Sequence, residues 1–98
     1  KKDWDLNKLE NLFLKKNVYI TFDVDGFDAS IMPATGTPEP GGLLWEDVIP
    51  IIKKVCKISN IVGADINELA PIKNFDSYNF LVAKLAYKIL SYTFEFKN

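Results

Sequence analysis

Three aspartates, Asp23, Asp25 and Asp28, lie within six residues of one another at the end of an apolar run that begins at Tyr19. If this run is a strand, its side chains alternate between two faces, so Asp23 and Asp25 point the same way at its C-terminal end. Two ionised carboxylates so close together repel each other unless a cation lies between them, which indicates a divalent metal. An Asx-rich turn after the strand accounts for the same residue types, because Asp and Gly are also common in turns.

A second acidic pair, Asp65 and Glu68, accompanies another short apolar stretch. We expect strands at 18–23 and 60–66, joined by an amphipathic crossover helix at 45–57. Such a connection makes the strands parallel, so their C-terminal ends open at one edge of the sheet, where ligand sites of α/β proteins lie. Four acids are therefore expected to converge on one crevice, which favours the metal over the turn.

The remaining elements follow from periodicity and capping residues. A first helix is predicted over 6–15, with Asp5 as its cap and Trp4 packed against its first turn. A last helix is predicted to start at a cap formed by Asp76 and to end near residue 92, before a frayed tail.

The segments around the first strand suggest how it is covered. The strand at 18–23 reads as apolar on both faces, as in a sheet covered on two sides, and Gly63 is expected to let a helix approach closely. The connection over 26–42 holds three prolines and four glycines, which predicts a shaped active-site loop. Pro50 costs nothing in the first turn of a helix but removes a hydrogen bond deeper inside one.

Composition excludes several classes of function. The chain has 98 residues and a net charge of −1, so it offers no electrostatic reason to expect nucleic acid or an anionic membrane as partner. No apolar run is long enough for a bilayer span and no signal-peptide core is seen, so a cytoplasmic protein is expected.

The single cysteine, Cys56, is expected to be buried and inert. Without any histidine, this chain alone cannot build a Ser-His or Cys-His dyad or a histidine-rich metal site.

Two longer segments, 21–42 and 63–71, together resemble the ureohydrolases, the family of arginase and agmatinase. The resemblance runs from about residue 17 to residue 92. It implies an α/β fold, namely the C-terminal portion of a three-layer α/β/α arginase-type fold with a parallel sheet. Residues 1–98 would then be the C-terminal part of one domain whose N-terminal two-thirds are absent.

The resemblance also implies roles for individual residues. Asp23 and Asp25 match ligands of a centre of two manganese ions, with Asp23 touching both ions and Asp25 chiefly one. Glu68 matches the carboxylate that holds the substrate guanidinium, and Thr37 matches a threonine of the substrate-side loop. Two hard cations that share carboxylates lower the pKa of a bridging water, and the resulting hydroxide attacks the guanidinium carbon and releases urea.

Other residues of these segments are read as structural. Asp28 is expected to brace the turn and Asp65 to orient loops, while Met32 and Trp45 are expected to pack. Ala29 stands where the family usually has proline, which reduces loop stiffness without touching the ligands.

The other metal ligands of the family, a histidine and an Asp-x-His-x-Asp segment, lie upstream of this chain, as does a proton-shuttling histidine. We therefore expect the 98 residues alone to bind metal weakly and to catalyse nothing. The loop Glu68–Pro71 resembles the agmatinase version of this segment more than the arginase version. The resemblance therefore implies agmatine, hydrolysed to putrescine and urea, over arginine, formiminoglutamate or guanidinobutyrate. Family members are commonly trimers or hexamers, so a homo-oligomer is implied.

Two rivals from other classes remain. The segment 22–30 also resembles the first motif of haloacid-dehalogenase-type phosphatases, in which the first aspartate accepts a phosphoryl group. Phe27 stands where that motif has threonine or valine. The other rival is a scaffold or subunit-contact segment whose carboxylates are merely solvated.

Overall fold

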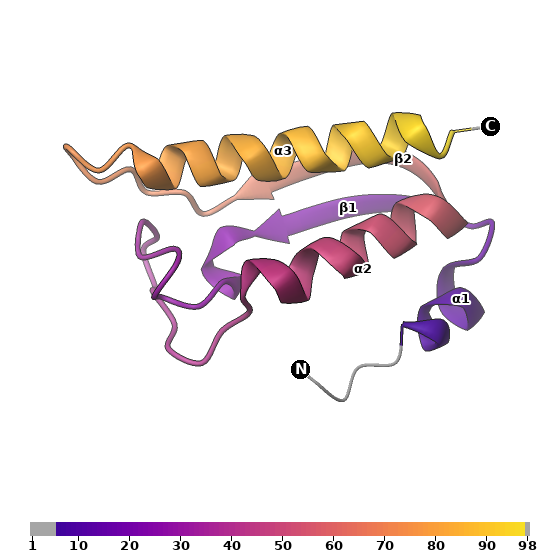
Figure 1. Ribbon diagram of the computed structural model, residues 1–98, viewed down its shortest axis with the longest axis horizontal. Helices are drawn as coiled ribbons and strands as arrows, with labels where there is room; N and C mark the ends of the chain where they lie inside the picture. Colours follow the sequence, from indigo (N-terminus) through magenta and orange to yellow (C-terminus); the bar gives the residue numbers. More distant parts are fainter. Residues whose placement is uncertain (1–5, 98) are drawn as a thin grey trace.

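The structure, a computed structural model, describes residues 6–97. Its elements in chain order are α1 (Asn7–Phe13), β1 (Asn17–Asp23), the 3₁₀ turn η1 (Val24–Gly26), α2 (Trp45–Ile58), β2 (Asn60–Asn67) and α3 (Ser77–Glu95). Figure 1 shows α2 and α3 running along the two strands, with the long connection before α2 and the segment before α3 at one end of the molecule. The predicted roles of Trp4 and Asp5 lie outside the described residues.

The two strands are parallel, as the crossover helix predicted. Their register runs from Asn17 opposite Asn60 to Asp23 opposite Asn67, and it skips Val62 between the pairs formed by Val18 and Tyr19. The C-terminal ends of both strands therefore lie at the same edge of the sheet.

The hydrophobic core lies between the sheet and the pair α2 and α3. The buried residues of these helices are Val48, Ile52, Cys56, Leu85 and Ile89, and the strand residues that pack against them are Ile20, Phe22, Ile61 and Ile66. The α/β class is thus confirmed, and the described residues form two layers of it. The expectation that β1 is apolar on both faces is wrong, because the face turned away from the helices carries Tyr19, Thr21 and Asp23, all exposed.

Gly63 lies under a side chain of the neighbouring strand and not under a helix. A Cβ atom built on it would lie 2.6 Å from Cε2 of Tyr19, so the glycine makes room for the tyrosine ring. The predicted helix approach is wrong at this position.

The helix ends differ from the sequence prediction. Helix α1 stops at Phe13, earlier than predicted, because Lys15 adopts a left-handed φ of 60° and donates its N–H to the carbonyl of Ile58. Helix α3 continues to Glu95, where a frayed tail was predicted, since the rings of Tyr92 and Phe96 stack at 6.5 Å. Asp76 precedes α3 but forms no side-chain cap hydrogen bond.

Helix α2 begins with a backbone N–H to carboxylate bond, from Leu44 to Asp47 at 2.8 Å. Pro50 is inside the helix, in its second turn, so the hydrogen bond that its missing N–H would have made is lost there. The other predictions for this region hold. Cys56 is buried, and Trp45 stacks on Phe27 with ring centroids 6.3 Å apart.

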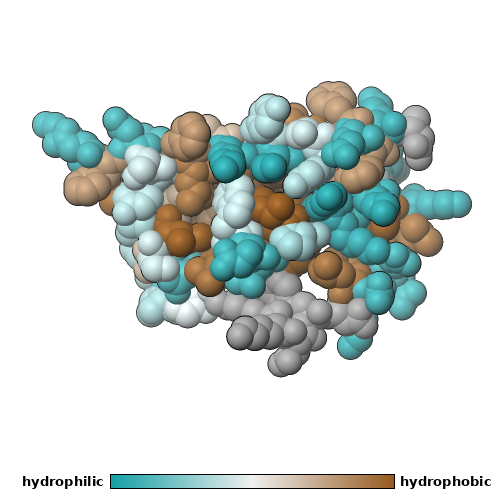
Figure 2. All heavy atoms as spheres, in the orientation of Figure 1, coloured by the Kyte–Doolittle hydropathy of each residue, from teal (hydrophilic) through white to brown (hydrophobic). Residues whose placement is uncertain are grey.

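Helix α3 also keeps large apolar side chains on its outer side. Phe80, Tyr87 and Phe94 are about two-thirds exposed, and Leu90 is 57% exposed. Figure 2 shows apolar patches interspersed among hydrophilic ones on one face of the molecule. Among residues 6–97, no helix is long and apolar enough to cross a membrane.

Candidate functional site

The first acidic pair lies where β1 ends, but not by strand alternation. The strand stops at Asp23, and Asp25 belongs to the turn η1, in which the neighbouring Val24 is completely buried. The alternation that predicted a shared direction for the two carboxylates is therefore wrong. Asp23 remains exposed at the strand end, and Asp25 accepts a hydrogen bond from Oγ1 of Thr37 at 3.3 Å.

Thr37 reaches Asp25 because the long connection is folded back on the strand end. The carboxylate of Asp28 accepts backbone N–H groups from Ser30, Gly41 and Gly42 at 2.7–3.1 Å. The pKa of Asp28 is lowered to about 2, first by the side chain and backbone N–H of Ser30 and then by the backbone N–H groups of Gly41 and Gly42. The predicted bracing role of Asp28 is thus confirmed, and so is the buried packing role of Met32.

The segment that carries Glu68 is joined to the same connection. Glu68 follows directly after β2, is exposed and has a φ of 74°, a left-handed conformation that turns the chain sharply. Two residues later, the backbone N–H of Ala70 donates to the carbonyl of Ala34 at 2.7 Å. The loops of Thr37 and Glu68 therefore meet at the edge where both strands end.

Asp65 is engaged elsewhere. Its carboxylate accepts hydrogen bonds from the hydroxyl groups of Thr21 and Tyr19 and from the side-chain amide of Asn67. The Thr21 hydroxyl, followed by that of Tyr19, holds the pKa of Asp65 below its ordinary value, and the bond to Asp65 raises the pKa of Tyr19. Its partners lie on the two strands, and one of them, Asn67, is the last residue of β2 before Glu68. The role of orienting loops stays a prediction.

The predicted convergence of four acids on one crevice is not found. Within residues 6–97, no three side chains of His, Cys, Asp or Glu lie together in a way that could hold a metal ion. Asp23 and Asp25 supply hard oxygen donors of the kind that manganese and magnesium take. They fit part of such a site, and its remaining ligands have to come from other residues.

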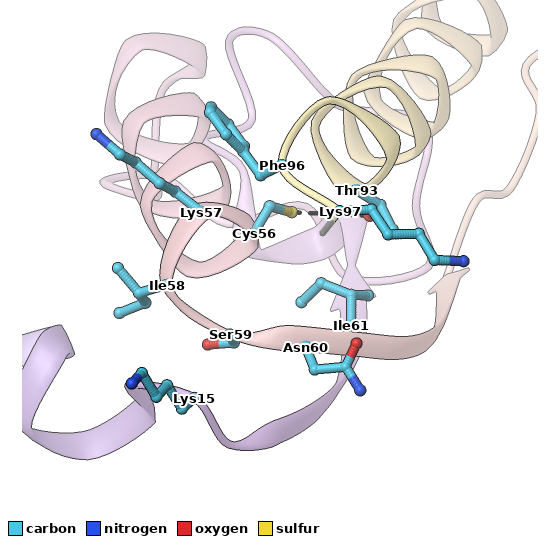
Figure 3. Close-up of a pocket in the computed structure, with 10 residues that line it drawn as sticks. All are labelled: Lys15, Cys56, Lys57, Ile58, Ser59, Asn60, Ile61, Thr93, Phe96 and Lys97. Carbon is cyan, nitrogen blue, oxygen red and sulfur yellow. Dashed lines mark hydrogen bonds between the residues drawn. The ribbon is translucent and has the colours of Figure 1, made fainter.

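A pocket of about 360 Å³ lies at the opposite end of the strands, between the C-terminal ends of α2 and α3. Figure 3 shows Lys57 and Lys97 pointing away from each other at its rim and Cys56 directed toward Thr93. Burial raises the pKa of the Cys56 thiol, whose sulfur is 3.8 Å from Oγ1 of Thr93. A buried protonated thiol and divergent lysines offer no nucleophile, so the acidic edge is the better candidate site.

Comparison with known proteins decides the family. The model of the arginase family matches residues 3–91. The chain belongs to the arginase family. It is 42% identical over 77 residues to an N(1)-aminopropylagmatine ureohydrolase of Synechocystis, which covers 79% of this chain and 25% of that protein. It is 38% identical over 77 residues to an agmatinase of Pyrococcus horikoshii, which covers 79% of this chain and 27% of that protein.

Solved structures of this family have the same fold. The proclavaminate amidino hydrolase of Streptomyces clavuligerus superposes with a TM-score of 0.84 at 25% identity, over 94% of this chain and 31% of that one. The agmatine ureohydrolase of Thermoplasma volcanium superposes with a TM-score of 0.76 at 33% identity, over 90% of this chain and 29% of that one. The chain thus spans about a quarter of the length of the curated relatives it matches, and the predicted arginase-type fold is confirmed.

The three-donor arrangement around Asp65 is the feature that sequence reasoning missed. The signal available was the pairing of two parallel strands, since Thr21 falls opposite Asp65 once the register is known. That register depends on the irregularity at Val62, and the residues around Val62 form no pattern from which this irregularity could be predicted.

Proposed function

We propose that this chain forms part of the active site of a manganese-dependent enzyme that hydrolyses a guanidino compound and releases urea. The observation that carries the proposal is the meeting of the Thr37 and Glu68 loops beside Asp23 and Asp25, at one edge of a parallel sheet. Membership of the arginase family supports a hydrolase and sets aside the phosphatase alternative.

Each residue has a proposed task. Asp23 and Asp25 would hold manganese together with ligands from outside the described residues. Manganese, when bound, would lower the pKa of water and so supply a nucleophile at neutral pH. Glu68, exposed on its left-handed turn, would hold the positively charged guanidinium by charge-assisted hydrogen bonds. Thr37 would fix the orientation of Asp25 through its hydroxyl.

Agmatine is the proposed substrate, with putrescine and urea as products. The loop Glu68–Pro71 favours it, and relatives named agmatinase support it. A second candidate is N(1)-aminopropylagmatine, because the relative from Synechocystis carries that name and shares 42% identity. Arginine and formimino compounds are the remaining alternatives in the family.

The 98-residue chain by itself is proposed to be inactive. Within its described part, too few ligands lie together to hold a metal, and it spans about a quarter of its relatives. The longer protein is proposed to be cytoplasmic and to assemble as a homotrimer or homohexamer.

A chimeric enzyme tests the proposal. In it, residues 17–92 of this chain replace the aligned segment of the agmatinase from Pyrococcus horikoshii. We expect manganese-dependent release of urea from agmatine, loss of that activity with a chelator, and restoration by added manganese.

Asp25→Asn in the chimera is expected to lower activity and to abolish the rise in unfolding temperature that manganese produces, because a neutral amide is a weaker ligand. Glu46→Gln is the matched control, since Glu46 is an exposed carboxylate in the first turn of α2 that is not one of the proposed ligands. Equal stabilisation by manganese in the chimera and in Asp25→Asn would favour the scaffold alternative.

A further inference from the structure

The carboxylate of Asp65 receives hydrogen bonds from both strands of the sheet. Oγ1 of Thr21 donates to Oδ1 at 2.6 Å and the hydroxyl of Tyr19 donates to Oδ2 at 3.0 Å, both from β1. Nδ2 of Asn67 donates to Oδ1 from the end of β2. An ionised carboxylate accepts at both oxygens and has no proton to donate, which suits three donors.

These donors lie directly before the residues of the proposed active site. Thr21 precedes Asp23 by two residues on the same face of β1, and Asn67 precedes Glu68 by one. Asn67 also lies opposite Asp23 in the register of the sheet. One carboxylate is therefore linked to the strand end that carries the proposed metal ligand and to the turn that carries the proposed substrate ligand.

Tyr19 reaches Asp65 because of Gly63. The tyrosine ring occupies the space over the glycine, where a Cβ atom would lie 2.6 Å from Cε2 and 2.8 Å from Cδ2. Any larger residue at position 63 would displace the ring and with it the hydroxyl. Gly63 thus makes room for the tyrosine ring whose hydroxyl group donates to the carboxylate of Asp65.

We propose that Asp65 is a positioning residue that fixes the distance between the metal side and the substrate side of the site by holding Thr21 and Asn67. This inference rests on the proposed function. Asp65 acts through its hydrogen-bond partners. Apart from strand pairing and loop contacts, Nδ2 of Asn67 also donates to Oγ1 of Thr21, at the longer distance of 3.5 Å. A displacement of about 1 Å between catalytic groups lowers rates by about 100-fold.

The chimera provides the test. Asp65→Asn keeps the shape of the side chain but turns one acceptor oxygen into a donor NH₂ group, which opposes the donors that face it. We expect the dissociation constant for manganese and the KM for agmatine each to rise about 10- to 100-fold, the range seen when partners of metal ligands are removed. Glu46→Gln, which removes a carboxylate on the exposed side of α2, is expected to change neither.

Single removals of the donors separate the two sides. Thr21→Val is expected to weaken manganese binding more than it raises KM, and Thr21→Ser, which keeps the hydroxyl, is expected to restore the binding. Asn67→Ala is expected to raise KM more than it weakens manganese binding. A residue that merely stabilised the fold would not produce this split.

The outcomes distinguish this inference from the function on which it rests. An active chimera in which Asp65→Asn changes only the unfolding temperature overturns the positioning role and leaves the function standing. A chimera without manganese-dependent hydrolysis of agmatine overturns both. If Asp65→Asn does not fold, Thr21→Val and Thr21→Ser decide the question, and equal manganese affinities for the two overturn it.

Discussion

Gly42 is the position in the long connection where an added methyl group would collide with the peptide bond between Phe27 and Asp28. A Cβ atom there would lie 2.7 Å from the backbone nitrogen of Asp28 and 2.7–2.8 Å from the carbonyl of Phe27. Real Cβ contacts are almost never that short, and backbone atoms cannot turn aside as a side-chain tip can. Gly42→Ala should therefore push the two arms of the connection apart.

The loss of folding stability in Gly42→Ala can be compared with that of the same substitution at two other glycines of the connection. Overpacking of this kind destabilises by about 1–3 kcal/mol. Gly41 has open space around it but a φ of 76°, so Gly41→Ala should cost about 1–2 kcal/mol through backbone strain alone. Gly36 has open space and no such φ, so Gly36→Ala should stay within about 0.5 kcal/mol of the parent.

The free energy of unfolding of each variant, measured in the chimera by urea denaturation, tests this order. Gly42→Ala should also raise the KM for agmatine, because the loosened connection carries Thr37. If Gly42→Ala proved as stable as Gly36→Ala, the close packing of Gly42 on Asp28 would be wrong.

Two further predictions concern pH and self-association. The pKa of Asp28 is about 2 in the folded chain against 3.8 ordinarily, so its stabilisation is present in full above pH 3.8 and is lost as the pH falls toward 2. Urea denaturation of the chimera between pH 2 and pH 5 should show a smaller dependence on pH in Asp28→Asn, and an unchanged dependence would contradict the bond pattern around Asp28. The purified 98-residue chain should self-associate through exposed apolar side chains of α3. Light scattering by the purified chain should decrease when Phe80 and Phe94 are both changed to Ser. Unchanged scattering would mean that the chain self-associates through a different surface.

The order and type of the elements could be predicted because each depends on residues close in sequence. The β-branched and aromatic residues before Asp23 and the helical spacing of Val48, Ile52 and Cys56 identified a parallel pair with a crossover helix. The helix ends could not be predicted in the same way. Helix α3 extends past Tyr92 because that ring stacks on Phe96, a contact that only a formed helix brings together.

The candidate site was predictable in its residue types and less so in its geometry. Thr37 and Glu68 came from a family resemblance and lie in loops that the structure joins through Ala34 and Ala70. The sequence suggested that Asp65 would lie in one crevice with the other acids. A carboxylate that binds a metal and one that accepts hydrogen bonds from hydroxyl groups cannot be distinguished by residue type alone. Only the pairing of the strands placed Thr21 beside it.

The residue that the strand register skips, Val62, sets the phase of β2. Counted in twos from Ile61, which packs against the helices, Gly63 and Asp65 would fall on the apolar side of the sheet. The extra residue reverses the alternation, so that Ile66 faces the helices while Asp65 faces the other way. A single exposed valine, far from any reacting group, thus decides whether this strand brings a charge into the hydrophobic interior or presents it beside its hydroxyl partners.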